Sequence, residues 1–261
     1  MKKLKLALIG PGFLNDIVAQ AWVDGYLPEY ELVGVLGRNA MRTEAFANHY
    51  GCKACSTIEE LMALEPDYTA EAASVKSVID YTETVLRAGS NLVVLSIGAF
   101  ADASFYNHIQ SVARETERKV HIASGAVGGF DILRTATLMS PVNVKMTGMK
   151  SPRALVHTSL NREGLIDIQE PVEVFSGTTK EAIAALPTHV NVSVAIALAS
   201  AGPEDTTLKI NAIPGYVGDE HRIMLEGDEI KTDLNIYSRT SRVAGWSIVA
   251  VLQNVVAPIV F

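Results

Sequence analysis

Between residues 5 and 124, short apolar runs typical of strands alternate with segments whose apolar residues recur at helical spacing. KLALIG (5–10) precedes FLNDIVAQAWVDG (13–25), and YELVGVLG (30–37) precedes NAMRTEAFANHYG (39–51). Strands that alternate with helices join through right-handed crossovers into a parallel sheet. The first half is therefore predicted to be α/β, with a Rossmann-type doubly wound parallel sheet that binds its ligand at the carboxyl ends of the strands.

The second half carries several short alternating runs, which predict strands, and fewer helical segments. Strands are expected at ALVHTSLN (154–161), VEVFSG (172–177), TTLKINAIP (206–214), EHRIMLEGD (220–228) and EIKTDLNIYS (229–238). The apolar segment 241–261 predicts a helix that returns to the first domain. We therefore expect one domain over 1–124, completed by that helix, and a second α+β domain over 125–240 with a mostly antiparallel sheet.

The first predicted strand–helix junction, ALIGPGFLNDIVAQ, carries Gly10 and Gly12. In dinucleotide-binding turns the first glycine makes the tight bend, and the second lets the backbone approach a pyrophosphate at the helix N-terminus. Phe13 and Leu14 follow in the first helical turn and are further candidate cofactor contacts. The third glycine of the usual pattern serves packing, and Asn15 stands in its place. We therefore predict that a dinucleotide still binds, with the Asn15 side chain bonded to a backbone group or a phosphate.

The end of the second predicted strand, VLGRNA, bears on which nicotinamide dinucleotide is preferred. NAD-preferring sites usually place Asp or Glu there to hold the ribose 2′-hydroxyl, but this chain has Arg38 and no acid. A carboxylate would repel a 2′-phosphate, whereas a guanidinium pairs with it. NADP is therefore the expected cofactor and NAD the second choice. The alternative interpretation of Arg38 is a solvated arginine at a helix start.

Composition disfavours several classes of function. A net charge of −7 disfavours a nucleic-acid partner, which needs a clustered basic face. No apolar run reaches the about 20 residues of a membrane span, and no secretory leader is visible, so we expect a cytoplasmic protein without a membrane partner. Cys52 and Cys55 form a C-x-x-C pair, but no second pair completes a structural zinc site. Ordinary thiols and no metal site are expected.

Five later blocks, in the order LSIGAFAD, ASGAVGGFD, HVNVSVAIALASAGPEDTTLKI, DEHRIMLEGD and RTSRVAGWS, resemble the L-aspartate dehydrogenase family. The similarity runs over essentially the whole chain. It implies NAD(P)-dependent oxidative deamination of L-aspartate to iminoaspartate, which gives oxaloacetate and ammonia or feeds NAD biosynthesis. It also implies a catalytic and dimerisation role for the second domain, with a homodimer formed through its sheets. By the same resemblance, His221 is the catalytic histidine, and Ala126 and Asn191 contact the cofactor.

The chemistry gives His221 a role of its own. A histidine with a pKa near neutral can activate water for imine hydrolysis and protonate the departing amine. The alternative is a strand histidine exposed on a sheet face. Glu220, one residue earlier on a strand, should point to the opposite face. His189 and His121 are competitors, for which a capping or surface role and a core role are the default expectations.

A dicarboxylate substrate needs cations and hydrogen-bond donors. Ser124 offers a hydroxyl, and Arg239 and Thr240 form a polar cluster before the last helix. The guanidinium of Arg239 suits a carboxylate, although a surface arginine is an equal interpretation. Lys150 follows a predicted strand and is another candidate for the side-chain carboxylate. Asp131 is expected to cap the helix that begins at ILRTAT.

The chain departs from the family pattern at three places. Asn15 replaces a glycine, Glu220 stands where Asn is common, and NIYSRTS lacks the Asn-Pro that usually precedes the Thr-Ser pair. Two alternatives to aspartate oxidation therefore stay open. One is a related NADP-dependent oxidoreductase that acts on another amino or oxo acid, and the other is a non-catalytic NADP(H)-binding sensor.

Overall fold

The computed structural model describes residues 2–186 and 190–261. Contacts between Cα atoms divide the chain into two compact units. The first unit comprises Met1–Gly125 together with Ala244–Phe261, and the second comprises Ala126–Val243. His189, named above as a competitor of His221, lies outside the described residues.

The first unit is built on a six-stranded sheet of order β3-β2-β1-β4-β5-β6. Every pair of neighbouring strands in it is parallel. The strands are β1 (Leu4–Ile9), β2 (Tyr30–Leu36), β3 (Lys53–Cys55), β4 (Tyr68–Glu71), β5 (Asn91–Val94) and β6 (Val120–Ile122). The chain builds outward from β1 to one side and then returns to place β4 on its other side. This order confirms the predicted doubly wound sheet.

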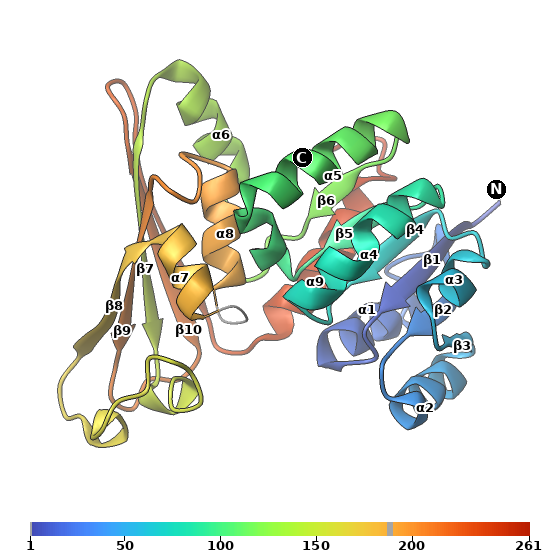
Figure 1. Cartoon of the computed structure of the whole chain (residues 1–261), viewed down its shortest axis with the longest axis horizontal. Helices are drawn as coiled ribbons and strands as arrows, with labels where there is room; N and C mark the ends of the chain where they lie inside the picture. Colours follow the sequence, from blue (N-terminus) through green and yellow to red (C-terminus); the bar gives the residue numbers. More distant parts are fainter. Residues whose placement is uncertain (1, 187–189) are drawn as a thin grey trace. The chain divides into compact units, whose positions relative to one another are not determined.

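Helices alternate with these strands along the chain, as Figure 1 shows in blue to green. They are α1 (Phe13–Val23), α2 (Ala40–Tyr50), α3 (Ile58–Met62), α4 (Val75–Arg87), η1 (Ile97–Ala101) and α5 (Ala103–Glu115). Most start where a side chain accepts a first-turn N–H: Asn39 caps α2, Thr57 caps α3, Ser74 caps α4 and Asp102 caps α5. α1 is different, because Gly12 stands at its N-cap and offers no side-chain cap.

The last helix, α9 (Arg242–Asn254), belongs to the core of the first unit. Leu252 is fully buried there, and its carbonyl oxygen accepts a 2.7 Å hydrogen bond from the hydroxyl of buried Tyr30. Close packing on α1 requires a glycine at 245, since a Cβ there would lie 2.9 Å from the Cβ of Ile17. The helix ends at Asn254, so the prediction that it continues to residue 261 is wrong.

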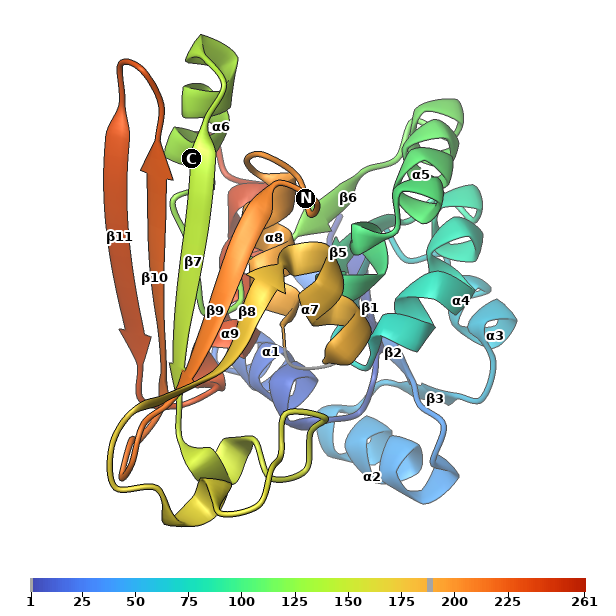
Figure 2. The same cartoon turned by 60° about the vertical axis from the view of Figure 1, so that its left-hand side comes forward.

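The second unit is an α+β unit with a five-stranded sheet of order β11-β10-β7-β9-β8. Only the β7–β9 pair is parallel, so the mostly antiparallel prediction is confirmed. The strands are β7 (Asn143–Lys150), β8 (Val172–Thr178), β9 (Thr206–Ala212), β10 (Asp219–Glu226) and β11 (Lys231–Ser238). The helices α6 (Phe130–Met139), α7 (Thr179–Ala185) and α8 (Asn191–Leu198) lie on one face of this sheet, as Figure 2 shows. Buried residues of β7, β9 and β10 form the core on that face.

Two local predictions in the second unit fail. Residues 154–161 form the end of a 3-10 helix, η2 (Pro152–Ala154), and turns rather than a strand. Their apolar pattern arises because Leu155 packs in a small separate cluster with Leu165. The strand that Lys150 was expected to follow is present as β7, which ends at Lys150 and buries alternate residues. Asp131 does not cap α6, because the helix begins at Phe130 with Gly129 at its N-cap.

Candidate functional site

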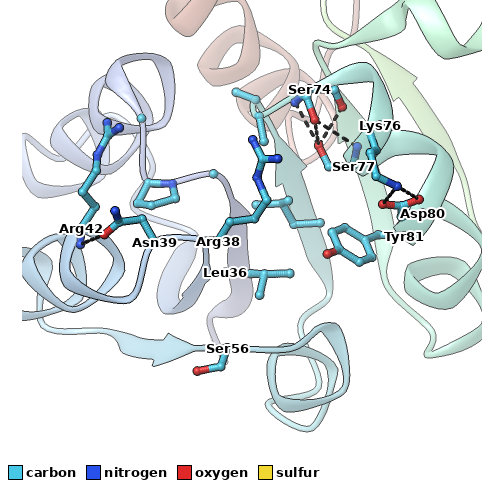
Figure 3. A pocket seen from close by; sticks show the side chains of 17 residues that line it. Leu36, Arg38, Asn39, Arg42, Ser56, Ser74, Lys76, Ser77, Asp80 and Tyr81 are labelled. Atoms are coloured by element: carbon cyan, nitrogen blue, oxygen red, sulfur yellow. Dashed lines mark hydrogen bonds and ion pairs between the residues drawn. The ribbon is translucent and has the colours of Figure 1, made fainter.

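A cavity of about 310 Å³ opens at the carboxyl ends of β1, β2 and β4, entirely within the first unit. This is the point where the strand order reverses around β1, which is where doubly wound sheets bind ligands. Its lining includes Gly10, Gly12, Arg38, Arg42 and Tyr81. Figure 3 labels Arg38, Arg42 and Tyr81 among the lining side chains, which come from the ends of strands and from α2 and α4.

The turn after β1 is shaped by its glycines. Gly10 has a φ of +103°, and a Cβ there would lie 2.8 Å from the Cβ of Ala73, two residues after the end of β4. A side chain is therefore excluded by both conformation and contact. A Cβ at Gly12 would meet nothing within 4 Å, although Gly12 lines the cavity. The uncapped N-terminus of α1 thus faces open space, which suits a phosphate.

Phe13 and Leu14 occupy the first turn of α1. The Phe13 side chain is exposed, while that of Leu14 packs against the core of the first unit. Neither side chain is among those that line the cavity. Any contact they make with a bound anion would therefore come from their backbone N–H groups.

Asn15 is fully buried, and its side chain braces the turn. Its Nδ2 donates to the carbonyl oxygens of Ile9 (2.8 Å) and Gly10 (2.9 Å). The prediction that this side chain reaches a backbone group is confirmed. Asn15 therefore replaces the missing glycine with two hydrogen bonds that hold the end of β1 to α1.

Replacing Asn15 with alanine is expected to lower the free energy of unfolding by about 1–3 kcal/mol, because buried carbonyl oxygens lose their donor. Denaturant unfolding of the two proteins measures this difference. Asn48→Ala, at an exposed asparagine of α2, is the matched control and should change the same quantity by no more than about 0.5 kcal/mol. Equal losses in the two variants would contradict the bracing role.

Two arginines lie beyond the end of β2. Arg38 and Arg42 both line the cavity, and Figure 3 shows Arg38 among the lining side chains and Arg42 at their margin. Asn39, between them, caps α2 by accepting a 3.0 Å hydrogen bond from the backbone N of Arg42. Gly37 lets the loop after β2 pass close to Pro11 in the turn after β1, since a Cβ at Gly37 would lie 2.5 Å from Cδ of Pro11. Arg38 was predicted from the sequence, whereas Arg42 was not, because its place in the cavity follows from the first turn of α2.

The loop after β4 is held by a carboxylate that the sequence argument did not single out. Glu71 is buried and accepts hydrogen bonds from the backbone N of Ala73 (2.8 Å), Ser74 (2.9 Å) and Ser96 (3.1 Å). Burial raises the pKa of Glu71, and these N–H donors oppose the rise. The visible signal was an acid at the carboxyl end of an apolar strand. Because Ala73 and Ser74 line the cavity, Glu71 fixes part of its wall.

α4 supplies the opposite wall. Tyr81, Lys76 and Asp80 line the cavity, and Lys76 Nζ lies 2.8 Å from Oδ2 of Asp80 on the same helix. Ser56, which precedes α3, also lines it. These residues come from separate segments and form no motif, so only the folded sheet brings them together.

His221 lies in β10 of the second unit, on the buried face with Ile223 and Leu225. Its side chain is 4% exposed, and its Nδ1 has no hydrogen-bond partner among the described residues. Burial, and after it the nearby charge of Lys150, lower the pKa of His221 to about 4, against the opposing charges of Asp219 and Glu220. The exposed-histidine alternative is wrong. The assumption of a pKa near neutral is also wrong, because a buried imidazolium loses its hydration.

Several charged groups surround His221. Lys150 Nζ, at the end of β7, lies 2.7 Å from Oδ1 of Asp219 at the start of β10. Glu220 accepts from Nδ2 of Asn235 at 2.8 Å and from the hydroxyl of Tyr216. Because side chains alternate along a strand, Glu220 points away from the His221 face, as the sequence argument expected.

The remaining predicted residues are divided between the two units. Ser124 follows β6 in the first unit, whereas Ala126 begins the second. Asn191 is the first residue of α8. Arg239 and Thr240 are exposed and follow β11 at the end of the sheet where β10 begins. Within the second unit, Arg239 and Thr240 are thus at the same end of the sheet as Lys150 and Asp219.

Comparison with known proteins gives matches over nearly the whole chain. Residues 131–255 match the C-terminal domain of aspartate dehydrogenase, and residues 8–123 match the NAD-binding domain of homoserine dehydrogenase. An L-aspartate dehydrogenase of Methanococcus maripaludis is 32% identical, with 98% of each chain aligned. The chain belongs to the L-aspartate dehydrogenase family. An L-aspartate dehydrogenase of Methanocaldococcus jannaschii is 27% identical, again over 98% of each chain.

Solved structures agree with the fold of this dehydrogenase family member. Aspartate dehydrogenase from Thermotoga maritima aligns with a TM-score of 0.81 and 23% identity over 99% of each chain. GenD2 from gentamicin A biosynthesis, solved in complex with NAD, aligns with a TM-score of 0.60 at 14% identity. The first unit is an NAD(P)-binding domain.

The residues around the cavity fit a dinucleotide in this domain. Gly12 leaves the start of α1 open to a pyrophosphate, and Gly10 bends the chain toward the end of β4. Arg38 and Arg42 offer positive charge where the ribose end of a dinucleotide lies in doubly wound folds. Among the described residues, no group of His, Cys, Asp and Glu side chains is placed to hold a metal ion.

Proposed function

We propose that this protein is an L-aspartate dehydrogenase that oxidises L-aspartate with NAD(P) to iminoaspartate, which water converts to oxaloacetate and ammonia. The full-length match to an L-aspartate dehydrogenase at 32% identity carries the proposal. The structure adds a cavity of about 310 Å³ in the first unit and a buried histidine in the second.

The cofactor, when bound, accepts the hydride from Cα of the substrate. The amino group must first lose a proton, because an ammonium has no electron pair with which to form the C=N bond. His221 is the base in this proposal, since its lowered pKa keeps the ring neutral over the whole range near neutral pH. After this proton has passed to solvent, the neutral ring takes a proton from the water that attacks the imine and returns it to the departing amine. Ser124, Arg239 and Thr240 are proposed to bind the substrate carboxylates.

The cofactor is held, in this proposal, by Gly10, Gly12 and the backbone of Phe13 and Leu14 at the pyrophosphate. Ala126 and Asn191 are proposed to contact it from the second unit, as the family resemblance implies. We further propose that NADP is preferred over NAD. Arg38 and Arg42 support this preference, because guanidinium groups pair with a 2′-phosphate and no acid follows β2.

Replacing Arg38 with alanine is expected to lower kcat/KM for NADP by about tenfold to a hundredfold, the value of one charge-assisted hydrogen bond. The same variant should change kcat/KM for NAD less than about threefold, since NAD lacks the 2′-phosphate. Steady-state kinetics with both cofactors measure the effect. Arg114→Ala, at an exposed arginine of α5 outside the cavity, is the control. Equal losses with both cofactors would contradict the 2′-phosphate assignment.

The activity itself is tested by following reduced-nicotinamide absorbance with L-aspartate and a panel of other amino acids and 2-hydroxy acids. We expect L-aspartate to give the highest kcat/KM. Faster turnover of another amino acid would overturn the substrate assignment. Tight NADPH binding with no turnover of any substrate would favour a non-catalytic sensor.

We further propose a homodimer formed through the second-unit sheets and a cytoplasmic location. The sheet supports the dimer, because its helices cover one face and residues such as Lys145 and Arg222 are exposed on the other.

The thiols of Cys52 and Cys55 are not joined in a disulfide, which suits a reducing compartment. No helix in the described part of the chain has the length and apolar character needed to cross a bilayer. Light scattering after size exclusion measures the mass, and a monomer would contradict the dimer.

A further inference from the structure

The ion pair between Lys150 and Asp219 lies next to His221 on one face of the second-unit sheet. β7 and β10 are antiparallel, and His221 is paired with Gly148. Side chains two residues apart on a strand point to the same face. Lys150, two residues after Gly148, and Asp219, two residues before His221, therefore share the face of the imidazole ring.

This pair is more than a surface contact. The Lys150 side chain is only 14% exposed, whereas that of Asp219 is 41% exposed. Withdrawing an ammonium from water costs free energy unless an anion compensates it. The 2.7 Å contact between Lys150 Nζ and Asp219 Oδ1 provides that compensation at the end of the apolar row of Ile223 and Leu225.

The surroundings of the ring leave it without a fixed proton partner. Its Nδ1 is buried and unpartnered among the described residues. Gly148 presents no side chain to it, and a Cβ there would lie 3.7 Å from this nitrogen. The charged groups that act on the ring are Lys150, Asp219 and Glu220. Glu220 points to the other face and is bonded to Tyr216 and Asn235, so Asp219 is the acid that shares the face of the ring.

We propose that Lys150 is a positioning residue that holds the Asp219 carboxylate away from His221 and so disfavours protonation of the ring. An ammonium that holds Asp219 prevents this carboxylate from pairing with an imidazolium, and its own charge repels a proton on the ring. Without Lys150, Asp219 is free to stabilise protonated His221. The consequence for catalysis rests on the proposed function, because His221 must be unprotonated to act as a base. The effect of Lys150 on the protonation of His221 can be measured without any turnover.

The direct test is an NMR titration of the histidine rings in the full chain, with the His221 signal assigned by its loss in His221→Gln. Lys150→Met should raise the pKa of His221 by at least about one unit, the usual effect of changing a neighbouring charge. Asp219→Asn should leave this pKa unchanged or lower it. A merely structural role would loosen the site in both variants and raise both values toward the ordinary histidine range. Shifts of the same sign, or no shift in Lys150→Met, would overturn the inference.

Two further variants guard against misfolding. Lys150→Arg keeps the positive charge and should retain the wild-type pKa of His221. Lys145→Met removes the same charge from an exposed position of β7 on the opposite face and should also have no effect. A shift in Lys145→Met as large as that in Lys150→Met would contradict a specific pair.

Kinetics separate this inference from the proposed function. If aspartate is the substrate, the acid limb of the kcat/KM profile should move to higher pH in Lys150→Met and follow the NMR titration. One outcome is that the wild-type protein does not turn over aspartate, while the pKa of His221 rises in Lys150→Met and does not rise in Asp219→Asn. This outcome refutes the proposed function and supports the role of the ion pair. Normal aspartate turnover by the wild-type protein, with an unchanged His221 pKa in Lys150→Met, supports the proposed function and refutes the role of the ion pair.

Discussion

Replacing His221 with alanine is expected to lower kcat for L-aspartate oxidation by about 100-fold to 10,000-fold, the usual contribution of a general acid–base group. The reason is that the variant has no base to deprotonate the substrate amine or to activate water for imine hydrolysis. Stopped-flow or steady-state absorbance of the reduced nicotinamide measures the loss. The affinity for NADPH should change much less than kcat, because the cavity of about 310 Å³ lies wholly in the first unit.

His121→Ala is the matched control for this variant. His121 is a histidine of β6, in the first unit, and burial lowers its pKa as well. It does not line the cavity, so its replacement should change kcat by only a small factor. Retention of more than a tenth of wild-type kcat in His221→Ala would remove His221 from the catalytic role. Equal losses in the two variants would indicate unfolding rather than chemistry.

Replacing Gly12 with alanine is expected to weaken NADPH binding at least about tenfold while leaving thermal stability nearly unchanged. A Cβ at this position contacts nothing in the protein within 4 Å, but it occupies the open start of α1 where a pyrophosphate approaches. Fluorescence titration of NADPH gives the dissociation constant, and differential scanning calorimetry gives the melting temperature.

Gly10→Ala provides the contrast. There the new Cβ meets Ala73 at 2.8 Å, and the backbone has a φ of +103°, so about 1–3 kcal/mol of stability should be lost together with binding. The two glycines are thus separated by their effect on stability, not by their effect on binding. A large fall in melting temperature for Gly12→Ala, or unchanged NADPH affinity, would contradict this assignment of the turn.

The parallel sheet of the first unit was predictable because each strand and helix carries its own local pattern. Asn15 shows a limit of such patterns. The sequence identified it as a missing packing glycine, whereas the structure shows a buried amide that bonds Ile9 and Gly10. Arg42 and Glu71 were missed because their places in the cavity depend on where α2 begins and where β4 ends.

In the second unit, apolar alternation misled at one segment. Residues 154–161 alternate because a loop buries Leu155 in a cluster of its own, so their pattern does not signal a strand. β7 was expected only as a strand before Lys150, and its place in the middle of the sheet comes from long-range pairing that the sequence does not show. The low pKa of His221 was also unreadable, since it depends on burial and on Lys150, which meets Asp219 across 69 residues of chain. Long-range pairing of strands creates that environment.

The most direct test of the central claim is the fate of the hydrogen on Cα of the substrate. L-Aspartate deuterated at Cα should be incubated with the protein and NADP, and the reduced cofactor and the keto acid analysed by mass spectrometry. The account predicts one deuterium in NADPH, together with oxaloacetate and ammonia in equal amounts. NADPH that forms without deuterium, or no NADPH at all with either NADP or NAD supplied under conditions where the cofactor binds, would contradict it.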